Sequence, residues 1–233
     1  MILPGSEESL RNVILLGLAV YLAASVNFSI ILLKVFNKGD PRDNFSGNAG
    51  SVNVARQLGK RWGLLILLLD MARAGAIAQV GVCLLPATIV PLLGFLLVVG
   101  NQKPLFHGFR GGKGVASYLG FTALISPVLA VVSCLVWVLA YGLFHQPFIG
   151  SFFMITVLGL GTIIHYSWTW PAIIGAGLTM ALIFQAHKTN IVAYRKKNGL
   201  KNIFTFLSLF TLIFILPPSP SLFHYLLTRA NEL

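Results

Sequence analysis

Residues 109–144 read FRGGKGVASYLGFTALISPVLAVVSCLVWVLAYGLF, a short basic turn followed by two apolar runs. The runs at 114–125 and 128–144 are separated by Ser126-Pro127. The first is short for a membrane-crossing helix, which needs about 20 residues. The glycines on either side of Lys113 allow the backbone to close around an anion beside a point charge. The stretch therefore predicts membrane helices joined by an anion-binding turn.

Further apolar runs lie on both sides of this stretch, at 12–33, 63–81, 84–100, 149–165, 170–186 and 203–217. Charged residues make up only 10% of the chain, against about 25% in soluble domains. The runs do not alternate with period two, and hydrocarbon offers no partner to free backbone groups, so the spans are expected to be helices. We predict an all-α integral membrane protein, a polytopic helical bundle whose first helix is retained and is not a signal peptide.

The net charge of +11 arises mainly from basic residues in three loops, at 34–61, 101–113 and 187–201. The turns near 81–86, 125–128 and 165–170 carry no lysine or arginine. Positive-inside bias then puts the basic loops in the cytoplasm and both termini outside. This distribution argues against nucleic acid as a partner, and it leaves open that several of the basic residues only set topology: Lys34, Lys38, Lys60, Lys196 and Lys197.

The first basic loop contains DPRDNFSGNAGSVN at residues 40–53. Arg42 offers a planar fork that matches a phosphate in two-point contact. Serine and asparagine side chains hydrogen-bond a phosphate or a polyol, and glycines supply turns. The composition fits a binding loop and a turn-rich connector equally well.

The second basic loop ends in Gly111-Gly112-Lys113-Gly114 and is expected to open a helix at about Val115. Free amides at a helix N-terminus favour an anion. A nucleotide-binding P-loop is excluded, because Gly114 stands where that motif has the serine or threonine that binds magnesium.

The remaining polar positions are sparse. Ser151 is expected to cap the helix that follows it. His187 and Asn190 are three apart and are expected to share a helical face, with His187 as a proton carrier or only a helix-end anchor. Asp70 and Arg73 are expected to pair with each other or to reach the first loop. Cys83 and Cys134 are expected to be packed thiols, and the six acidic residues argue against paired-carboxylate or metal-cluster chemistry.

In this order, over residues 15–200, the motifs resemble those of the bacterial acyl-phosphate:glycerol-3-phosphate acyltransferase family of the PlsY type. That family has a serine in the first helix, then DxR, GSGNxGATN, LLLD, FKGGKGVAT, a SLGS turn and HxxNI. The matching positions here are Ser25, 40–42, 46–53, 67–73, 109–117, 148–151 and 187–191.

The resemblance implies seven membrane helices within a domain of residues 1–200, followed by an additional helix within 201–233. It implies transfer of a fatty acyl group from acyl-phosphate to the 1-hydroxyl of glycerol 3-phosphate. The product would be lysophosphatidic acid for phospholipid synthesis, made by a monomer in the bacterial cytoplasmic membrane without metal or cofactor.

By the same resemblance, Ser151, His187 and Asn190 would position the acceptor hydroxyl or assist proton transfer. The substrate-binding residues would be those of the first helix and the two glycine-rich loops: Ser25, Arg42, Ser46, Gly47, Asn48, Gly50, Asn53, Gly111, Gly112, Lys113 and Gly114.

The chain departs from the family pattern at Phe45, Asn101 and Phe148. The two phenylalanines are expected to narrow the acceptor pocket. A relative with a different acceptor alcohol and a non-catalytic scaffold both stay open. A transporter of anionic solutes is less favoured, because the only charges within the apolar runs are Asp70 and Arg73 and no repeat relates the two halves.

Overall fold

The computed structural model describes residues 7–198, and within them every regular element is a helix, which confirms the all-α class. The chain divides into two compact units, residues 1–188 and 189–233. Helix α10 (Lys188–Asn198) forms nearly all that is described of the second unit. The expected helix at 203–217 lies outside the described residues, and the domain boundary at residue 200 stays a prediction.

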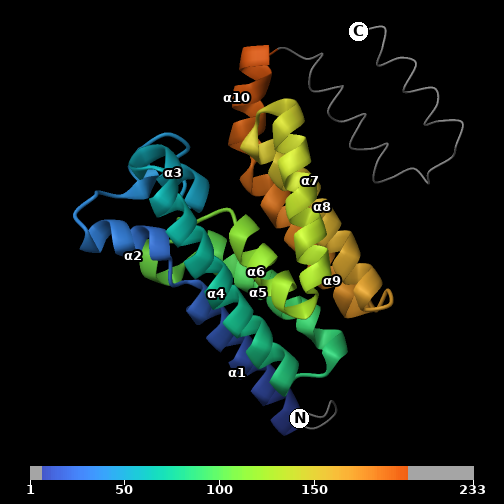
Figure 1. The fold of residues 1–233 in the computed structure, drawn as a ribbon. Coiled ribbons are helices and arrows are strands. Elements are labelled where there is room, and N and C mark those ends of the chain that lie inside the picture. Colours follow the sequence, from blue (N-terminus) through green and yellow to red (C-terminus); the bar gives the residue numbers. More distant parts are fainter. Residues whose placement is uncertain (1–6, 199–233) are drawn as a thin grey trace, which may run out of the picture. The chain divides into compact units, whose positions relative to one another are not determined.

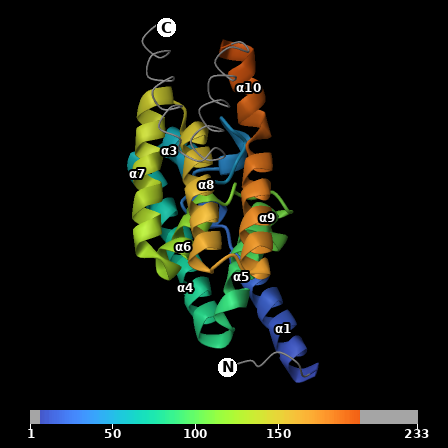
Figure 2. The same ribbon diagram turned by 90° about the vertical axis from the view of Figure 1, so that its right-hand side faces the viewer.

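The long helices of the first unit form two packed groups (Figures 1 and 2). One group contains α1 (Glu7–Ala24), α4 (Lys60–Leu84), α5 (Val90–Gln102) and α6 (Val115–Ile125). The other contains α7 (Pro127–Phe144), α8 (Pro147–His165) and α9 (Trp170–Ala186). Contacts of α5 with α9 and of α6 with α8 join the two groups.

Short helices fill the connections that carry the polar motifs. They are α2 (Phe28–Val35), η1 (Pro41–Asp43), α3 (Ser51–Leu58), η2 (Ala87–Ile89) and η3 (Leu105–His107). Helix α3 packs on α4, and Figure 1 draws α2 and α3 together at one end of the first group. The loop at 40–53 is therefore more than a chain of turns.

The apolar surface of the first unit is divided between an inner core and an outer face. The core packs α1, α4, α5, α6, α8 and α9 against one another around buried Leu97, Phe121 and Leu158. The outer face of α7 exposes large apolar side chains such as Val128 and Leu143. Such a face suits lipid, since lipid tails are as apolar as leucine. Cys83 and Cys134 are exposed on the outer surface, so the expectation of packed thiols was wrong.

The described residues contain five candidate membrane spans, with α1 and α2 counted together as Leu10–Val35 and η2, α5 and η3 together as Ala87–His107. There are six if α9 and α10 count as one broken span. Helix α6 has 11 residues, as short as its run predicted. The predicted number of seven spans in residues 1–200 is not confirmed.

The apolar run at 12–33 is not one helix, because Asn27 caps a new helix within it. Helix α1 ends at Ala24 and α2 begins at Phe28. The Asn27 side-chain oxygen accepts a hydrogen bond from the Ile30 amide at 3.1 Å, which is the usual N-cap contact. The run at 84–100 is likewise shortened, since α5 begins only at Val90 with Pro91 in its first turn.

Candidate active site

The two basic loops meet at one end of the first unit. The Ala49 amide donates to the Gly111 carbonyl at 3.3 Å. The Arg42 Nη1 atom donates to the carbonyls of His107 (2.8 Å) and Arg110 (3.0 Å). The structure thus joins two motifs that are about sixty residues apart in the sequence.

Arg42 is held on its other edge by Asp40. Its Nε lies 2.9 Å from Asp40 Oδ1, and its Nη2 lies 2.6 Å from Asp40 Oδ2. Asp40 Oδ1 also accepts from the Arg42 amide and caps η1. The side-chain hydrogen bond from Arg42 holds the pKa of Asp40 below its ordinary value. All three nitrogens of the guanidinium therefore have partners within the protein.

Asn53 fixes the shape of the first loop from inside it. Its Nδ2 donates to the carbonyls of Pro41 (2.7 Å), Asn48 (2.9 Å) and Asn44 (3.2 Å). Its Oδ1 accepts from the Ser46 amide at 3.2 Å. The residue is buried, so it organises the loop and its amide is not directed to an open surface.

The other predicted residues of the first loop lie around Asn53. Gly47 takes the left-handed conformation with φ +62°, which glycine tolerates without strain. Gly50 is the N-cap residue of α3. Within the described part of the chain, Asn48 Oδ1 is buried without a hydrogen-bond donor. A buried carbonyl oxygen in this state lacks the donor that such atoms normally have.

The second loop is shaped by its backbone. The Gly111 amide donates to the Gln102 carbonyl and the Gly112 amide to the Asn101 carbonyl. A Cβ at Gly111 would collide with the Asn101 carbonyl oxygen, and one at Gly112 would lie 2.7 Å from Asn101 Oδ1. Gly114 has φ +88° and begins α6 at Val115, as predicted. Asn101, which departs from the family pattern, is buried against this loop.

Lys113 belongs to a small basic cluster drawn from three elements. Burial, and then the nearby charge of Arg56 in α3, lower the pKa of Lys113 to about 8. The charge of Lys113 also acts on His187 at the end of α9. Two cations and an imidazole so placed favour an anion.

His187 is the C-cap residue of α9 and is buried. Its Nδ1 lies 2.8 Å from the Ile183 carbonyl. Because a carbonyl only accepts, Nδ1 carries the proton and Nε2 is left unprotonated. Burial, and then the charge of Lys113, lower the pKa of His187, so the free imidazole is neutral. The expected helical face shared with Asn190 was wrong, because α9 ends at Ala186 and Asn190 lies in α10, in the second unit.

Ser151 does not cap a helix, contrary to expectation. Pro147 begins α8 earlier, with Gln146 as its N-cap residue, and Ser151 Oγ donates to the Pro147 carbonyl at 3.0 Å. Proline is favoured at this first helical position because it has no amide to satisfy.

The two phenylalanines that depart from the family pattern, Phe45 and Phe148, lie in different surroundings. Phe148 packs edge-on against Phe152, whose ring lies 5.4 Å from that of His187. Phe148 is therefore one ring away from the candidate base. Phe45 is 71% exposed, so the expectation that it narrows a pocket was wrong.

Ser25 lies in the break between α1 and α2, fully buried, and donates to the Tyr21 carbonyl at 2.8 Å. The next residue, Val26, accepts a hydrogen bond from Arg73 Nη1. Arg73 also lies 3.3 Å from Asp70, so the expected pair is present, and it donates to Ser117 at the start of α6.

The sequence reasoning missed three residues that help to hold the site together. The Asn27 amide donates to His107 Nε2 at 3.3 Å, which ties the α1–α2 break to the second loop. Arg56 was listed among the basic residues of the first loop but was given no role in the site. An asparagine inside an apolar run is a recognisable cap signal, whereas nothing local in the sequence distinguishes His107 or Arg56.

An all-α bundle with apolar outer helices and a cluster of basic groups beside two joined loops defines an integral membrane enzyme that handles anionic substrates. The sequence profile described as "Glycerol-3-phosphate acyltransferase" matches residues 14–197. The chain therefore belongs to the glycerol-3-phosphate acyltransferase family, which confirms the resemblance seen in the sequence.

Similar proteins agree with this assignment. A glycerol-3-phosphate acyltransferase of Anaeromyxobacter sp. (strain Fw109-5) is 38% identical over 179 residues, covering 74% of this chain and 88% of the relative. One of Neisseria meningitidis serogroup B (strain ATCC BAA-335 / MC58) is 33% identical over 190 residues, with the same coverage. The crystal structure of PlsY (YgiH), an integral membrane glycerol 3-phosphate acyltransferase, in its glycerol 3-phosphate form superposes with a TM-score of 0.73. That protein is 30% identical, and the match covers 81% of this chain and 93% of the other.

Proposed function

We propose that this chain transfers a fatty acyl group from an acyl-phosphate to the 1-hydroxyl of glycerol 3-phosphate. The observation that carries the proposal is the junction of the two basic loops, where Ala49 bonds Gly111 and Arg42 bonds the carbonyls of the second loop. Two phosphate-bearing substrates need adjoining cationic groups. The acceptor is supported by the solved PlsY structures, which are described as glycerol 3-phosphate and lysophosphatidic acid forms.

Lys113, Arg56 and the α6 N-terminus would neutralise one phosphate, and Arg42 the other. An acyl-phosphate is already activated for acyl transfer. Positioning and charge neutralisation then supply most of the rate, because the reacting groups are held together in a site whose charges are already oriented. Gly111, Gly112 and Gly114 are assigned to this phosphate by resemblance. The amides of Gly111 and Gly112 bond the Gln102 and Asn101 carbonyls, so the absence of side chains there serves the close packing of the loop that presents Lys113.

In the reaction, the acceptor hydroxyl oxygen attacks the acyl carbonyl carbon and forms the new ester bond. The carbon–oxygen bond to phosphate breaks, and phosphate leaves with the bonding electrons. His187 Nε2 takes the hydroxyl proton and passes it to the departing phosphate. The Ile183 carbonyl supports this role by holding the proton on Nδ1.

The acceptor would be oriented by the polar atoms beside the loops. Asn48 Oδ1 would accept a hydrogen bond from a glycerol hydroxyl, since it is buried without a donor among the described residues. Ser151 is assigned to the same task by resemblance. Ser25 would support the loops from the α1–α2 break, and Asn190 keeps its assignment from the sequence alone.

The enzyme would act as a monomer in the bacterial cytoplasmic membrane, with its active-site loops in the cytoplasm. The exposed basic side chains at the site end, among them Lys34, Arg56 and Arg110, favour this orientation.

The test is reconstitution of the full-length protein with palmitoyl-phosphate and labelled glycerol 3-phosphate. We expect labelled lysophosphatidic acid, and none when palmitoyl-CoA replaces the acyl-phosphate. Absence of product with both donors would contradict the assignment, and product from the CoA ester alone would contradict the donor.

A different acceptor alcohol is the second candidate, because the Phe148–Phe152 pair packs against His187. It predicts consumption of palmitoyl-phosphate in an acceptor panel without dependence on glycerol 3-phosphate.

A further inference from the structure

The edge of Arg42 that suits a phosphate is already taken by a carboxylate of the same chain. Its Nη1 atom is fixed by the carbonyls of His107 and Arg110, so the second loop sets the plane of the guanidinium. The remaining edge, Nε and Nη2, faces the two oxygens of Asp40 at 2.9 and 2.6 Å. This two-point arrangement is the one that arginine makes with phosphate. A phosphate arriving at Arg42 must therefore replace Asp40.

The pair is open enough for such a replacement. The Arg42 side chain is 19% exposed and the Asp40 side chain 30% exposed. Access to water reduces the net stabilisation that such a pair provides, although its two-point geometry makes it stronger than a single contact. A phosphate dianion carries more charge than one carboxylate and accepts the same two hydrogen bonds, so it competes well for this edge.

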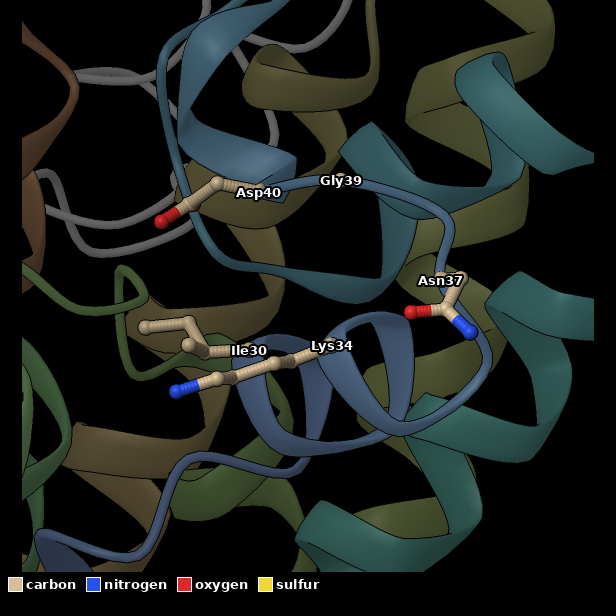
Figure 3. A pocket seen from close by; sticks show the side chains of 5 residues that line it. All are labelled: Ile30, Lys34, Asn37, Gly39 and Asp40. Carbon is tan, nitrogen blue, oxygen red and sulfur yellow. The ribbon is translucent and has the colours of Figure 1, made fainter.

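The structure also provides a place for the displaced carboxylate. A cavity of about 350 Å³ is lined by Ile30, Lys34, Asn37, Gly39 and Asp40 (Figure 3). Figure 3 shows the Lys34 amine and the Asp40 carboxylate pointing to the same side of this cavity, from α2 and from the start of the first loop. Because both side chains line this cavity, an Asp40 carboxylate that leaves Arg42 would have a second cation, Lys34, on the same cavity wall.

We propose that Asp40 occupies the phosphate-binding edge of Arg42 in the free enzyme. A phosphate monoester that binds Arg42 displaces the Asp40 carboxylate into the cavity, where it pairs with Lys34. The inference rests on the proposed function, which assigns a phosphate to Arg42. Asp40 then competes with every anion for the Arg42 guanidinium and lowers the affinity of each. The loss is largest for singly charged anions, because they compete less well than a phosphate dianion. It is a specificity-determining residue for phosphate monoesters.

The Asp40→Asn variant separates this role from a structural one. Asparagine keeps the Oδ1 acceptor that caps η1, but it removes the competing charge. We expect the KM for one phosphate substrate to fall by about two- to fivefold, the change that corresponds to losing the modest net stabilisation of a partly exposed ion pair. A residue that merely shapes the loop would raise KM on substitution.

Asp43→Asn is the matched control, because Asp43 is exposed and acts on Arg42 through its charge and not through a hydrogen bond to the guanidinium. Titrations of full-length wild type, Asp40→Asn and Asp43→Asn would use glycerol 3-phosphate and palmitoyl-phosphate. A fall in KM for either substrate, larger in Asp40→Asn than in Asp43→Asn, supports the inference and identifies whose phosphate meets Arg42. No fall for either substrate overturns it, whereas an inactive wild type overturns the proposed function instead.

Lys34→Met tests whether the displaced Asp40 carboxylate pairs with Lys34. If Lys34 receives Asp40, this substitution raises KM in the wild-type background and leaves it unchanged in the Asp40→Asn background. An equal rise in both backgrounds would mean that Lys34 binds the substrate itself, which would overturn this part of the inference.

Discussion

The two loops of the site contain similar residues but are built in different ways. The second loop is held by backbone hydrogen bonds and by contacts so close that no side chain fits at Gly111 or Gly112. The first loop is held by side chains, chiefly Asn53 from within and Arg42 across to the second loop. Changes in the second loop should therefore abolish the site, and changes in the first should weaken it by degrees.

The largest effect is expected from Lys113→Ala. Removing the cation of the second loop should lower kcat/KM by about 100-fold or more, the usual cost of losing a charge-stabilising group. Steady-state assay of lysophosphatidic acid measures it. Lys103→Ala, an exposed lysine on the same loop, should change kcat/KM less than about twofold. Equal losses in the two variants would mean that the general positive charge of the loop matters, and not the position of Lys113.

Gly112→Ala against Gly50→Ala tests the contrast between the loops directly. The new methyl at Gly112 would meet Asn101 Oδ1 at 2.7 Å and the Ala49 carbonyl at 3.1 Å. We expect a loss of unfolding free energy of up to about 3 kcal/mol from overpacking. At Gly50 the methyl would contact only the Asn48 side-chain amide, which can rotate away. The loss of unfolding free energy should therefore stay under about 1 kcal/mol. Thermal unfolding in detergent compares them, and similar losses would break the comparison.

Asn53→Ala should have an intermediate effect on the first loop. It removes one amide that serves three carbonyls, of which two, those of Pro41 and Asn48, lie within 2.9 Å. The half-exposed loop lets water replace part of these bonds, so the loss of unfolding free energy should be about 1–1.5 kcal/mol. Thermal unfolding in detergent measures this loss as well. A loss as large as that of Gly112→Ala would contradict the claim that the first loop is weakened only by degrees when one side chain is removed.

The smallest effect concerns pH. Burial and Arg56 lower the pKa of Lys113 to about 8, so its positive charge is present below pH 8 and lost above it. The phosphates of the substrates are fully ionised there, since their second pKa is about 6. We expect kcat/KM, which reports the free enzyme, to fall by about fivefold from pH 8 to 9, as the charged fraction of Lys113 drops from about one half to about one eleventh.

Lys113→Arg is the control for this profile, because arginine keeps its charge throughout the range. Its alkaline fall should be absent, and an unchanged fall would assign the titration to another group.

The sequence predicted the elements with local signals and missed those made by tertiary contact. The start of α6 at Val115 follows from the glycines before it, and the apolar runs marked most of the long helices. Ser151 was misplaced because the Pro147 signal, four residues earlier, was not weighed. The pairing of Arg42 with Asp40 and with the carbonyls of residues 107 and 110 depends on two loops meeting in space, which no local pattern encodes.

The central claim is that the joined loops bring two phosphate substrates together for direct acyl transfer. The most direct measurement is the ratio of inorganic phosphate released to lysophosphatidic acid formed by the reconstituted wild-type protein, with palmitoyl-phosphate present and glycerol 3-phosphate varied. The account predicts one phosphate for each lysophosphatidic acid and no release without the acceptor. Phosphate release that is independent of glycerol 3-phosphate, or an absence of lysophosphatidic acid, would contradict it.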